Sequence, residues 1–372
     1  MQFELTATDA GTSARTGRLA LRSGTVETPV FMPVGSRAAV RGLTPDQLRE
    51  AGARMILANT YHLGLRPGAE VVAECGGLHS FMGWNGPILT DSGGYQVFSL
   101  AAHRVMTEDG VHFRSPVDGA EIFLGPREAM RIQNLLGADV VMVFDHCAPY
   151  PCSHDHARDA LERTFRWSAL CKEVHDRDDQ ALFGIVQGST YDDLRERSAR
   201  GTTEIDFDGY AIGGVSVGEE EESRHRAVRV TMPFLPADRP RYLMGVGFPI
   251  DVLRAIAEGV DMFDCVAPTR MGRNATAFTP QGRLRLRNSA MSRDGRPVAD
   301  GCGCACCRLY SRAYLHHLFR VGEMLGPILL SIHNLSFYAD LMAGARQAVS
   351  TGTFARFRDD FIARYRGGKD GE

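Results

Sequence analysis

The sequence lacks the features that mark several large classes of protein. Among its 372 residues there is no apolar run near the roughly 18 residues that a membrane span requires. The first residues, from Met1 to Leu5, are polar and charged and contain no apolar signal-peptide core. Internal repeats and low-complexity segments are absent as well. We therefore expect a cytoplasmic protein that does not span a membrane.

The sequence also lacks the glycine pattern of a dinucleotide-binding loop. No Gly-x-Gly-x-x-Gly occurs, and the pairs Gly93-Gly94 and Gly213-Gly214 indicate such a loop only weakly. There is no excess charge of one sign either, because 42 Lys and Arg face 45 Asp and Glu and the net charge is −3. This charge excludes a positive field over the whole surface as the means of binding nucleic acid.

Cysteine is scarce overall but concentrated in one place. Nine cysteines occur in the chain, and four of them lie within residues 302–307. Cys302, Cys304 and Cys307 form a C-x-C-x2-C pattern, and His333 can complete a Cys3His ligand shell. Three thiolates and one imidazole fill the tetrahedral coordination of Zn²⁺ and leave no open position. The pattern therefore predicts a structural zinc ion, with the chemistry elsewhere in the chain.

Two alternatives to this ligand set stay open at the level of sequence. In the first, the cysteines form a disulfide or have no role, which the reducing cytoplasm disfavours. In the second, His316 or His317 replaces His333 as the fourth ligand. Cys306 is the expected spare thiol.

Positive charge gathers around the cysteine cluster. Between residues 283 and 320, eight arginines and two aspartates give a net charge of +6. The arginines are Arg283, Arg285, Arg287, Arg293, Arg296, Arg308, Arg312 and Arg320. Such a local basic patch suits contact with a phosphate backbone, and a solvated surface is the equally weighted alternative.

Short apolar runs alternate with segments of helical periodicity along most of the chain. Eight such strand–helix units over about 250 residues are typical of an α/β protein with a (β/α)8 TIM barrel, and a doubly wound sheet is the competing architecture. The predicted strands are residues 31–34, 55–58, 88–90, 140–144, 182–186, 210–212, 242–244 and 262–263. The clearest predicted helices are residues 44–51, 126–136, 156–175, 191–200 and 249–259.

The chain is longer than the barrel alone requires. We predict a catalytic barrel domain with an N-terminal extension at residues 1–280 and a zinc-binding subdomain at residues 281–340. Residues 341–372 are predicted to form a C-terminal helix and tail that pack on the barrel.

Polar residues follow the predicted strands at the point where each strand ends. They are Asn59, Asp91, Asp145, Gln187, Gly213-Gly214 and Asp264. Because active sites of such barrels lie at the carboxyl ends of the strands, we expect these residues to share one mouth. A single aspartate in this position is more often a turn or helix cap, but three carboxylates together indicate a site that can supply a nucleophile and a general acid/base.

At these residues the sequence resembles the tRNA-guanine transglycosylase family. The matching segments are 59–63 (NTYHL), 90–98 (TDSGGYQVF), 144–147 (FDHC), 184–188 (GIVQG), 212–219 (IGGVSVGE), 261–266 (DMFDCV), 268–270 (PTR) and 310–317 (YSRAYLHH). They occur in the family's order from about residue 28 to about residue 341. The resemblance implies a barrel with an inserted zinc-binding subdomain, and exchange of guanine in a tRNA anticodon for a 7-deazaguanine.

The resemblance also implies a role for each site residue. Asp264 is implied to be the nucleophile at C1′ of the ribose, and Asp91 the neighbouring acid/base. Asp145 and Gln187, with the backbone of Gly214 and Val215, are implied to bind the edge of the base. Tyr95 and Met244 are implied to enclose the base, and Thr269, Arg270 and Arg273 to contact RNA.

Further implications concern cofactors and partners. No nucleotide cofactor is expected, because one glycosidic bond replaces another. The expected partners are the tRNA anticodon loop, which lets a base unstack most easily, and a second copy of the chain, since homodimers are usual in this family.

A few positions depart from the family pattern. His146 replaces the usual Glu and Val215 the usual Leu, and residues 271, 272 and 275 also vary. Val217 matches the bacterial pattern, which favours the small aminomethyl base preQ1 over the bulkier queuine. A queuine-salvaging enzyme and a non-catalytic tRNA-binding subunit remain the alternatives.

Overall fold

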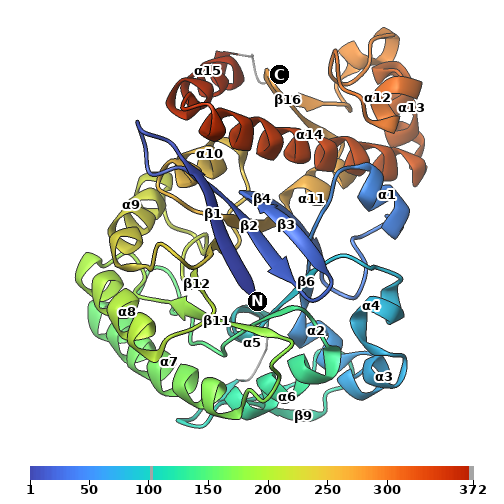
Figure 1. Cartoon of the computed structure of the whole chain (residues 1–372). Helices are drawn as coiled ribbons and strands as arrows, with labels where there is room; N and C mark the ends of the chain where they lie inside the picture. The colour runs from blue at the N-terminus through green and yellow to red at the C-terminus, as the bar shows by residue number, and fades with distance from the viewer. Residues whose placement is uncertain (101–103, 368–372) are drawn as a thin grey trace.

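The structure is a computed structural model that describes residues 1–100 and 104–367. Its centre is a closed barrel of parallel strands, in which each strand pairs with the next along the chain and the last pairs with the first (Figure 1). The barrel strands are β4 (Val30–Gly35), β5 (Ile56–Asn59), β6 (Ile88–Asp91), β10 (Val140–Met142), β11 (Ala181–Val186), β12 (Gly209–Ile212), β13 (Arg241–Leu243) and β14 (Met262–Cys265). The predicted (β/α)8 barrel is therefore confirmed.

The barrel strands form where the sequence has short apolar runs. Every residue of β5, β6, β11 and β12 is buried. Continuous burial arises because helices cover the outer face of a parallel barrel and side chains fill its interior. The predicted strands are all present, and their ends differ from the predicted ones by at most two residues.

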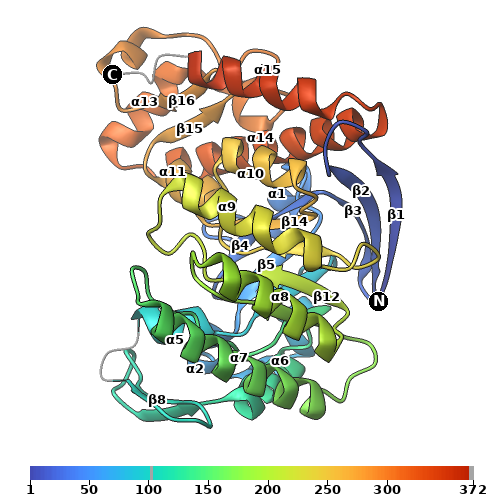
Figure 2. The ribbon, with the colours of Figure 1, turned by 90° about the vertical axis from the view of Figure 1, so that its left-hand side faces the viewer.

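Helices surround the barrel on its outside (Figures 1 and 2). They are α1 (Pro45–Glu50), α2 (Thr60–Leu65), α3 (Ala69–Glu74), α4 (Gly77–Met82), α5 (Gly94–Leu100), α6 (Pro126–Leu136), α7 (His154–Val174), α8 (Asp192–Ile205), α9 (Glu221–Thr231) and α10 (Pro249–Ala257). A short 3₁₀ helix, η1 (Met232–Phe234), follows α9. All five clearly predicted helices are present.

Two of these helices extend beyond their predicted limits for local reasons. α7 begins at His154 because the Ser153 side chain caps its first turn. α8 continues to Ile205, five residues past the predicted end, although Gly201 stands in its path. A Cβ at Gly201 would come within 2.5 Å of the Phe165 ring, so this glycine permits close packing between α7 and α8 and does not end the helix.

An antiparallel sheet covers the amino ends of the barrel strands. It consists of β1 (Gln2–Thr8), β2 (Arg15–Leu21) and β3 (Gly24–Thr28) (Figure 1). Arg15 and Asp261, both buried, form a bidentate ion pair with N···O distances of 3.0 and 2.5 Å. Because Asp261 directly precedes β14, this pair fastens the sheet to the end of the barrel that faces away from the strand carboxyl ends.

A second small sheet interrupts the barrel between β6 and α6. Its strands are β7 (Val105–Met106), β8 (Val111–Arg114) and β9 (Glu121–Leu124), which pair antiparallel. Val111, Phe113 and Leu124 are buried in this region, so one face of the sheet packs on the protein.

The chain after β14 builds a small unit beside the barrel (Figures 1 and 2). Its elements are α11 (Ala267–Arg273), β15 (Thr276–Thr279), β16 (Gly282–Arg285), η2 (Ser289–Arg293), α12 (Ala305–Leu309), α13 (Arg312–Val321), α14 (Leu325–Ser350) and α15 (Phe354–Gly367). The unit has its own apolar core, which includes Ala277, Leu286, Leu315 and Leu330. α14 runs without a break across residue 340, where the prediction placed a boundary, and the three-part division remains a prediction.

In the part of the chain that the structure describes, no helix combines the length and the apolar character needed to cross a membrane.

Candidate active site

Polar side chains converge at the carboxyl ends of the barrel strands. Asp91 ends β6, and Asp264 is the third residue of β14. Asp145 follows β10 by three residues, and Gln187 follows β11 directly. Because the carboxyl ends of parallel barrel strands meet on one face, these four side chains lie around the same mouth. The structure thus brings together the residues that the sequence placed at strand ends.

The Asp91 carboxylate is buried and accepts three hydrogen bonds. The Thr60 N–H donates to Oδ1 at 3.0 Å, and the Gln96 side-chain amide donates to Oδ2 at 3.1 Å. The Asn59 amide also donates to Oδ2. Burial raises the pKa of Asp91 to about 7, assisted by the nearby charge of Asp264 and opposed by the hydrogen bonds. A carboxyl group with such a pKa can release and recover a proton at neutral pH.

Asp264 is half-buried, and one of its two carboxylate oxygens accepts hydrogen bonds. Oδ1 accepts hydrogen bonds from the Tyr242 hydroxyl at 2.6 Å and from the Gly245 N–H at 2.7 Å. Burial raises the pKa of Asp264, and these two hydrogen bonds counteract the rise. Within residues 1–100 and 104–367, no donor contacts Oδ2. A carboxylate that is held by one oxygen and free at the other can act as a nucleophile.

Asp145 and Gln187 form a hydrogen-bonded pair. Gln187 Nε2 donates to Asp145 Oδ2 at 2.6 Å, and the Ser92 hydroxyl donates to Oδ1 at 3.2 Å. Both residues of the pair are buried, at 6% and 2% exposure. Burial raises the pKa of Asp145 to about 6, so the group is mostly ionised at neutral pH. An ionised carboxylate beside a carboxamide can bind two adjacent N–H groups of a flat ligand.

Two glycines make room for this pair. A Cβ at Gly94 would lie 2.8 Å from both the backbone oxygen and Oδ1 of Asp145. Gly214 has φ of +62°, and a Cβ there would lie 2.3 Å from Gln187 Oε1. The polar pair therefore packs directly against backbone, which only glycine permits at these two positions.

The other predicted base-contact residues lie around the same mouth. Tyr95 is on α5 and is 49% exposed. Met244 follows β13, and its sulfur lies close to the backbone of Gly213. A Cβ at Gly213 would be 3.6 Å from this sulfur. Val215 is buried behind Gly214. A cavity of about 530 Å³ adjoins this region, and Tyr95 and Val217 are among the residues that line it.

His146, a departure from the family pattern, faces that cavity. Its ring stacks on Phe98 with a centroid distance of 4.6 Å, and Nδ1 hydrogen-bonds with Arg163 Nη1 at 3.2 Å. Burial and the positive charge of Arg163 lower the pKa of His146 to about 3. The ring is therefore neutral at physiological pH and leaves the charge of neighbouring Asp145 unchanged.

The residues predicted to contact RNA lie on α11 and differ in exposure. Arg270 is exposed and Arg273 is half-buried, whereas Thr269 is buried with 4% exposure. Burial together with the charges of Arg41 and Arg270 lowers the pKa of Arg273, so these three guanidinium groups lie close together. Arg41 comes from the loop after β4, and its place in the cluster was not predicted because it is distant in sequence.

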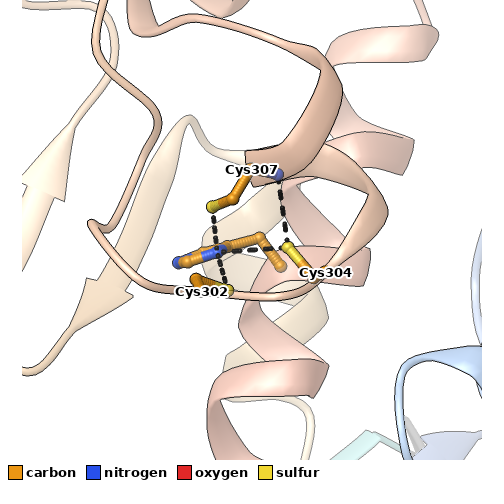
Figure 3. Close-up of side chains that lie close together, drawn as sticks. Cys302, Cys304 and Cys307 are labelled. Carbon is orange, nitrogen blue, oxygen red and sulfur yellow. Dashed lines mark hydrogen bonds between the residues drawn. The ribbon is translucent and has the colours of Figure 1, made fainter.

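The four predicted zinc ligands meet in one cluster (Figure 3). The sulfurs of Cys302, Cys304 and Cys307 lie 3.7, 3.7 and 3.3 Å from His333 Nδ1. A tetrahedral zinc ion with Zn–S near 2.3 Å and Zn–N near 2.0–2.1 Å gives S···N edges of about 3.5 Å. His333 Nε2 hydrogen-bonds to the Phe278 carbonyl oxygen at 2.9 Å, which leaves Nδ1 to bind a metal. The ligand types and spacing fit a closed structural site.

The alternative ligands are engaged elsewhere. His316 Nδ1 hydrogen-bonds to the Leu286 carbonyl oxygen at 2.8 Å, and His317 is exposed. Cys306 is fully buried in the small apolar core and lies outside the ligand cluster. All nine cysteines are free, so the disulfide alternative is not observed.

Residues of the site that were missed at the level of sequence include Ser92, Tyr242 and Arg195. Ser92 supports Asp145, Tyr242 holds Asp264, and Arg195 binds the backbone beneath the base-contact residues. Tyr242 carried a usable signal, since it stands two residues before Met244 and side chains two apart share a face of a strand. Ser92 and Arg195 act through contacts that only folding creates.

Comparison with known proteins agrees with this geometry. The family model described as queuine tRNA-ribosyltransferase matches residues 9–367. A queuine tRNA-ribosyltransferase of Pelotomaculum thermopropionicum is 55% identical over 367 residues, which cover 99% of each chain. One of Symbiobacterium thermophilum is 53% identical over 99% of this chain and 92% of its own. One of Stenotrophomonas maltophilia is 55% identical over 98% of this chain and 97% of its own.

A closed barrel with carboxylates at its mouth, a Cys3His cluster at its side and identity above one half along nearly the whole length lead to one assignment. The chain belongs to the queuine tRNA-ribosyltransferase family.

Proposed function

We propose that this chain is a tRNA-guanine transglycosylase that replaces guanine at the wobble position of G-U-N anticodons with preQ1. The observation that carries the proposal is the convergence of Asp264, Asp91 and Asp145 on one barrel mouth, each in a different environment. Exchange of bases at one sugar needs these three functions, namely a nucleophile, a proton carrier and an acceptor that recognises the base.

The proposed reaction is a double displacement. In the first step, Oδ2 of Asp264 attacks C1′ of the ribose, the C1′–N9 bond breaks, and guanine leaves with the bonding pair of electrons. Asp91 donates a proton to the departing base. In the second step, N9 of preQ1 attacks C1′, the ester bond to Asp264 breaks, and Asp91 recovers a proton from N9. Two inversions retain the configuration at C1′, as in retaining glycosidases.

Base recognition is proposed to rest on the buried pair Asp145 and Gln187. The guanine edge presents an N–H and an exocyclic amine. An ionised carboxylate can accept a hydrogen bond from each of them. Val217 lines the adjoining cavity, and we propose that its side chain limits the space for a larger substituent on the base. We therefore favour preQ1 over queuine as the incoming base.

The metal in the Cys3His cluster is proposed to be zinc. Thiolate-rich tetrahedral sites select zinc, and four protein ligands leave no position for a substrate. The ion would hold the small unit in place, and this unit with the Arg41, Arg270 and Arg273 cluster would position the tRNA phosphates. Two arginines of the basic stretch, Arg296 and Arg312, are paired with Asp294, which makes them poorer candidates for contact with RNA phosphates.

A second copy of the chain is the proposed protein partner. Apolar side chains that are exposed on the small unit include Leu309, Tyr314, Val321 and Met324, at 69%, 39%, 57% and 77% exposure. Exposed apolar side chains gathered on one unit suit a protein interface. Sedimentation of the purified protein tests this proposal, and the expected species has twice the mass of one chain. The cytoplasmic location stays a prediction.

The central experiment measures uptake of labelled guanine into unmodified tRNA with a G-U-N anticodon. We expect uptake by the wild type, chase of the label by preQ1, and a loss of at least about 10³-fold in Asp264→Asn. A denaturation-resistant protein–tRNA adduct should form with the wild type and not with the variant. The matched control is Asp208→Asn, since Asp208 lies at the opposite end of the barrel and accepts the Leu182 N–H.

The outcomes separate the alternatives. Chase by queuine alone would favour a salvage enzyme. Absence of uptake by folded, zinc-loaded protein that still binds tRNA would favour a non-catalytic tRNA-binding subunit and overturn the proposal.

A further inference from the structure

A buried arginine lies directly beneath the proposed base site. Arg195 stands in the first turn of α8 and has 0% exposure. Its guanidinium group makes all its hydrogen bonds to backbone oxygens, with Nε to Ser189 at 2.6 Å, Nη1 to Gly213 at 2.8 Å and to Val186 at 3.3 Å, and Nη2 to Gly214 at 3.1 Å. Arg195 therefore holds together the segments that follow β11 and β12. These are barrel strands close to α8 (Figure 1).

Burial of the Arg195 charge without a carboxylate partner is unfavourable for the free energy of folding. In the described residues no carboxylate hydrogen-bonds to Arg195, and Glu219 and Cys147 act on it only through space. Burial lowers the pKa of Arg195 to about 10, so the group still carries its charge at neutral pH. Since a buried charge without a paired ion is destabilising, the backbone carbonyl dipoles that face Arg195 must compensate its charge. The hydrogen bonds to Arg195 therefore fix the orientation of these backbone carbonyl groups.

The hydrogen bonds of Arg195 determine which way two peptide groups face. In a trans peptide the carbonyl and the N–H point in opposite directions. Because the carbonyls of Gly213 and Gly214 point to Arg195, the N–H groups of Gly214 and Val215 point away from it. Neither N–H has a hydrogen-bond partner in the described residues. The next two N–H groups along the loop, of Ser216 and Val217, are both bound by the Glu219 carboxylate.

The loop thus presents two unused donors beside the Gln187 side chain. Gln187 Oε1 packs on Gly214, as the close approach of a Cβ there shows. A guanine whose N1–H and amine face Asp145 would carry its one carbonyl oxygen, O6, on the same edge. An N–H donor is the group that this oxygen requires.

We propose that Arg195 is a positioning residue that orients the Gly214 and Val215 N–H groups to donate to the carbonyl oxygen of the base. The inference rests on the proposed function and deepens it, because it assigns the recognition of the 6-oxo group to a residue that does not touch the base. It also explains why a charged side chain is buried here.

The test compares equilibrium binding of guanine and 6-thioguanine to the wild type and to Arg195→Lys. The two bases share every donor, but sulfur is a much weaker acceptor than oxygen. Lysine keeps the charge and cannot span four carbonyl oxygens. We expect Arg195→Lys to bind guanine about 10–100-fold more weakly, to lose less affinity for 6-thioguanine, and to keep its affinity for tRNA.

The matched control is Arg15→Lys, which alters a buried arginine at the other end of the barrel. It should lower Tm without changing the preference for guanine over 6-thioguanine. A merely structural role of Arg195 predicts equal losses for both bases, and that result would overturn the inference. If the wild type exchanges guanine but Arg195→Lys keeps the same preference for guanine over 6-thioguanine, only this inference is wrong. If the wild type does not bind guanine, the proposed function is wrong as well.

A measurement on the wild type covers the case in which Arg195→Lys does not fold. Amide hydrogen exchange in the segment 212–218 should slow when guanine is added, because the two N–H groups become bonded. Unchanged exchange at Gly214 and Val215 with guanine bound would contradict the proposal.

Discussion

At the residue scale, three aspartates around one mouth differ because their neighbours differ. Asp91 is surrounded by donors and buried, and its pKa is raised to about 7. Asp264 keeps one oxygen free of the hydrogen bonds that hold the other. Asp145 is tied to Gln187 and Ser92. Each environment suits one of the three proposed roles, and all three were identifiable in sequence as residues at strand ends.

The hydrogen bond from Tyr242 to Asp264 should matter for chemistry and not for base binding. Tyr242→Phe removes this bond and leaves the Gly245 N–H in place. A hydrogen bond to a charged group is worth about 1.5–3 kcal/mol, so we expect kcat to fall about 10–100-fold with KM for guanine unchanged. The control is Tyr210→Phe, since Tyr210 is buried in β12 and its hydroxyl accepts a hydrogen bond from the Phe207 N–H at the far end of the barrel. A raised KM with normal kcat would refute this role.

The raised pKa of Asp145 predicts that base binding weakens in acid. The carboxyl is ionised above about pH 6 and protonated below it, and only the ionised form accepts two N–H groups. The Kd for guanine should therefore be constant above pH 7 and rise about tenfold per pH unit below 6. Equilibrium binding in the absence of tRNA measures this apart from the chemical step in which Asp91 transfers a proton. Asp145→Asn should bind weakly and without pH dependence, and a flat wild-type profile from pH 8 to 5 would contradict the assignment.

At the element scale, the site depends on where strands end and how the next turn is shaped. The segment after β12 contains Gly213 and Gly214, and the latter has φ of +62°. The double glycine was visible in sequence, and its position at a strand end could be predicted. Its contact with Gln187 could not, because this contact joins the ends of two different strands.

Gly214→Ala should abolish base binding through a steric contact. A Cβ would lie 2.3 Å from Gln187 Oε1 and displace the carboxamide from Asp145. Gly83→Ala is the matched control, because Gly83 has φ of +68° and nothing lies within 4 Å of a Cβ there. Both variants bear the left-handed strain of about 1–2 kcal/mol, so Gly83→Ala measures the effect of that strain on Tm without the steric contact. Only Gly214→Ala should lose guanine affinity, and equal affinities would show that the contact is unimportant.

At the scale of the whole molecule, the metal cluster is connected through α14 to the helix that carries the proposed tRNA contacts. His333 is next to Asn334, whose side chain bonds the Pro268 carbonyl of α11 at 2.9 Å and the Phe278 N–H at 2.9 Å. α11 carries Arg270 and Arg273. A change at the ligands can therefore reach the proposed tRNA contacts through α14.

Removal of the metal should weaken tRNA binding more than base binding. We expect Cys302→Ser to lose bound zinc, to lower Tm by at least about 5 °C and to raise the Kd for tRNA about tenfold, while guanine affinity stays within about threefold. Zinc content by elemental analysis, calorimetry and filter binding measure these effects. Cys75→Ser is the control, since Cys75 is exposed and outside the cluster. Full tRNA affinity in a zinc-free protein would refute the link.

The sequence by itself determined the barrel, the strand ends with their aspartates, and the three cysteines of the metal cluster, because each follows from a short stretch of chain. The structure selected His333 over His316 and His317 as the fourth member of the cluster. Apolar runs predict buried strands, and thiol spacing predicts a metal shell, whatever the rest of the chain does. Only the tertiary structure decided what surrounds these groups. The pKa of Asp91, the hydrogen bond from Tyr242 and the hydrogen bonds of Arg195 arise from residues that are distant in sequence. Burial and hydrogen bonding are properties of neighbours in space, and folding alone creates those neighbours.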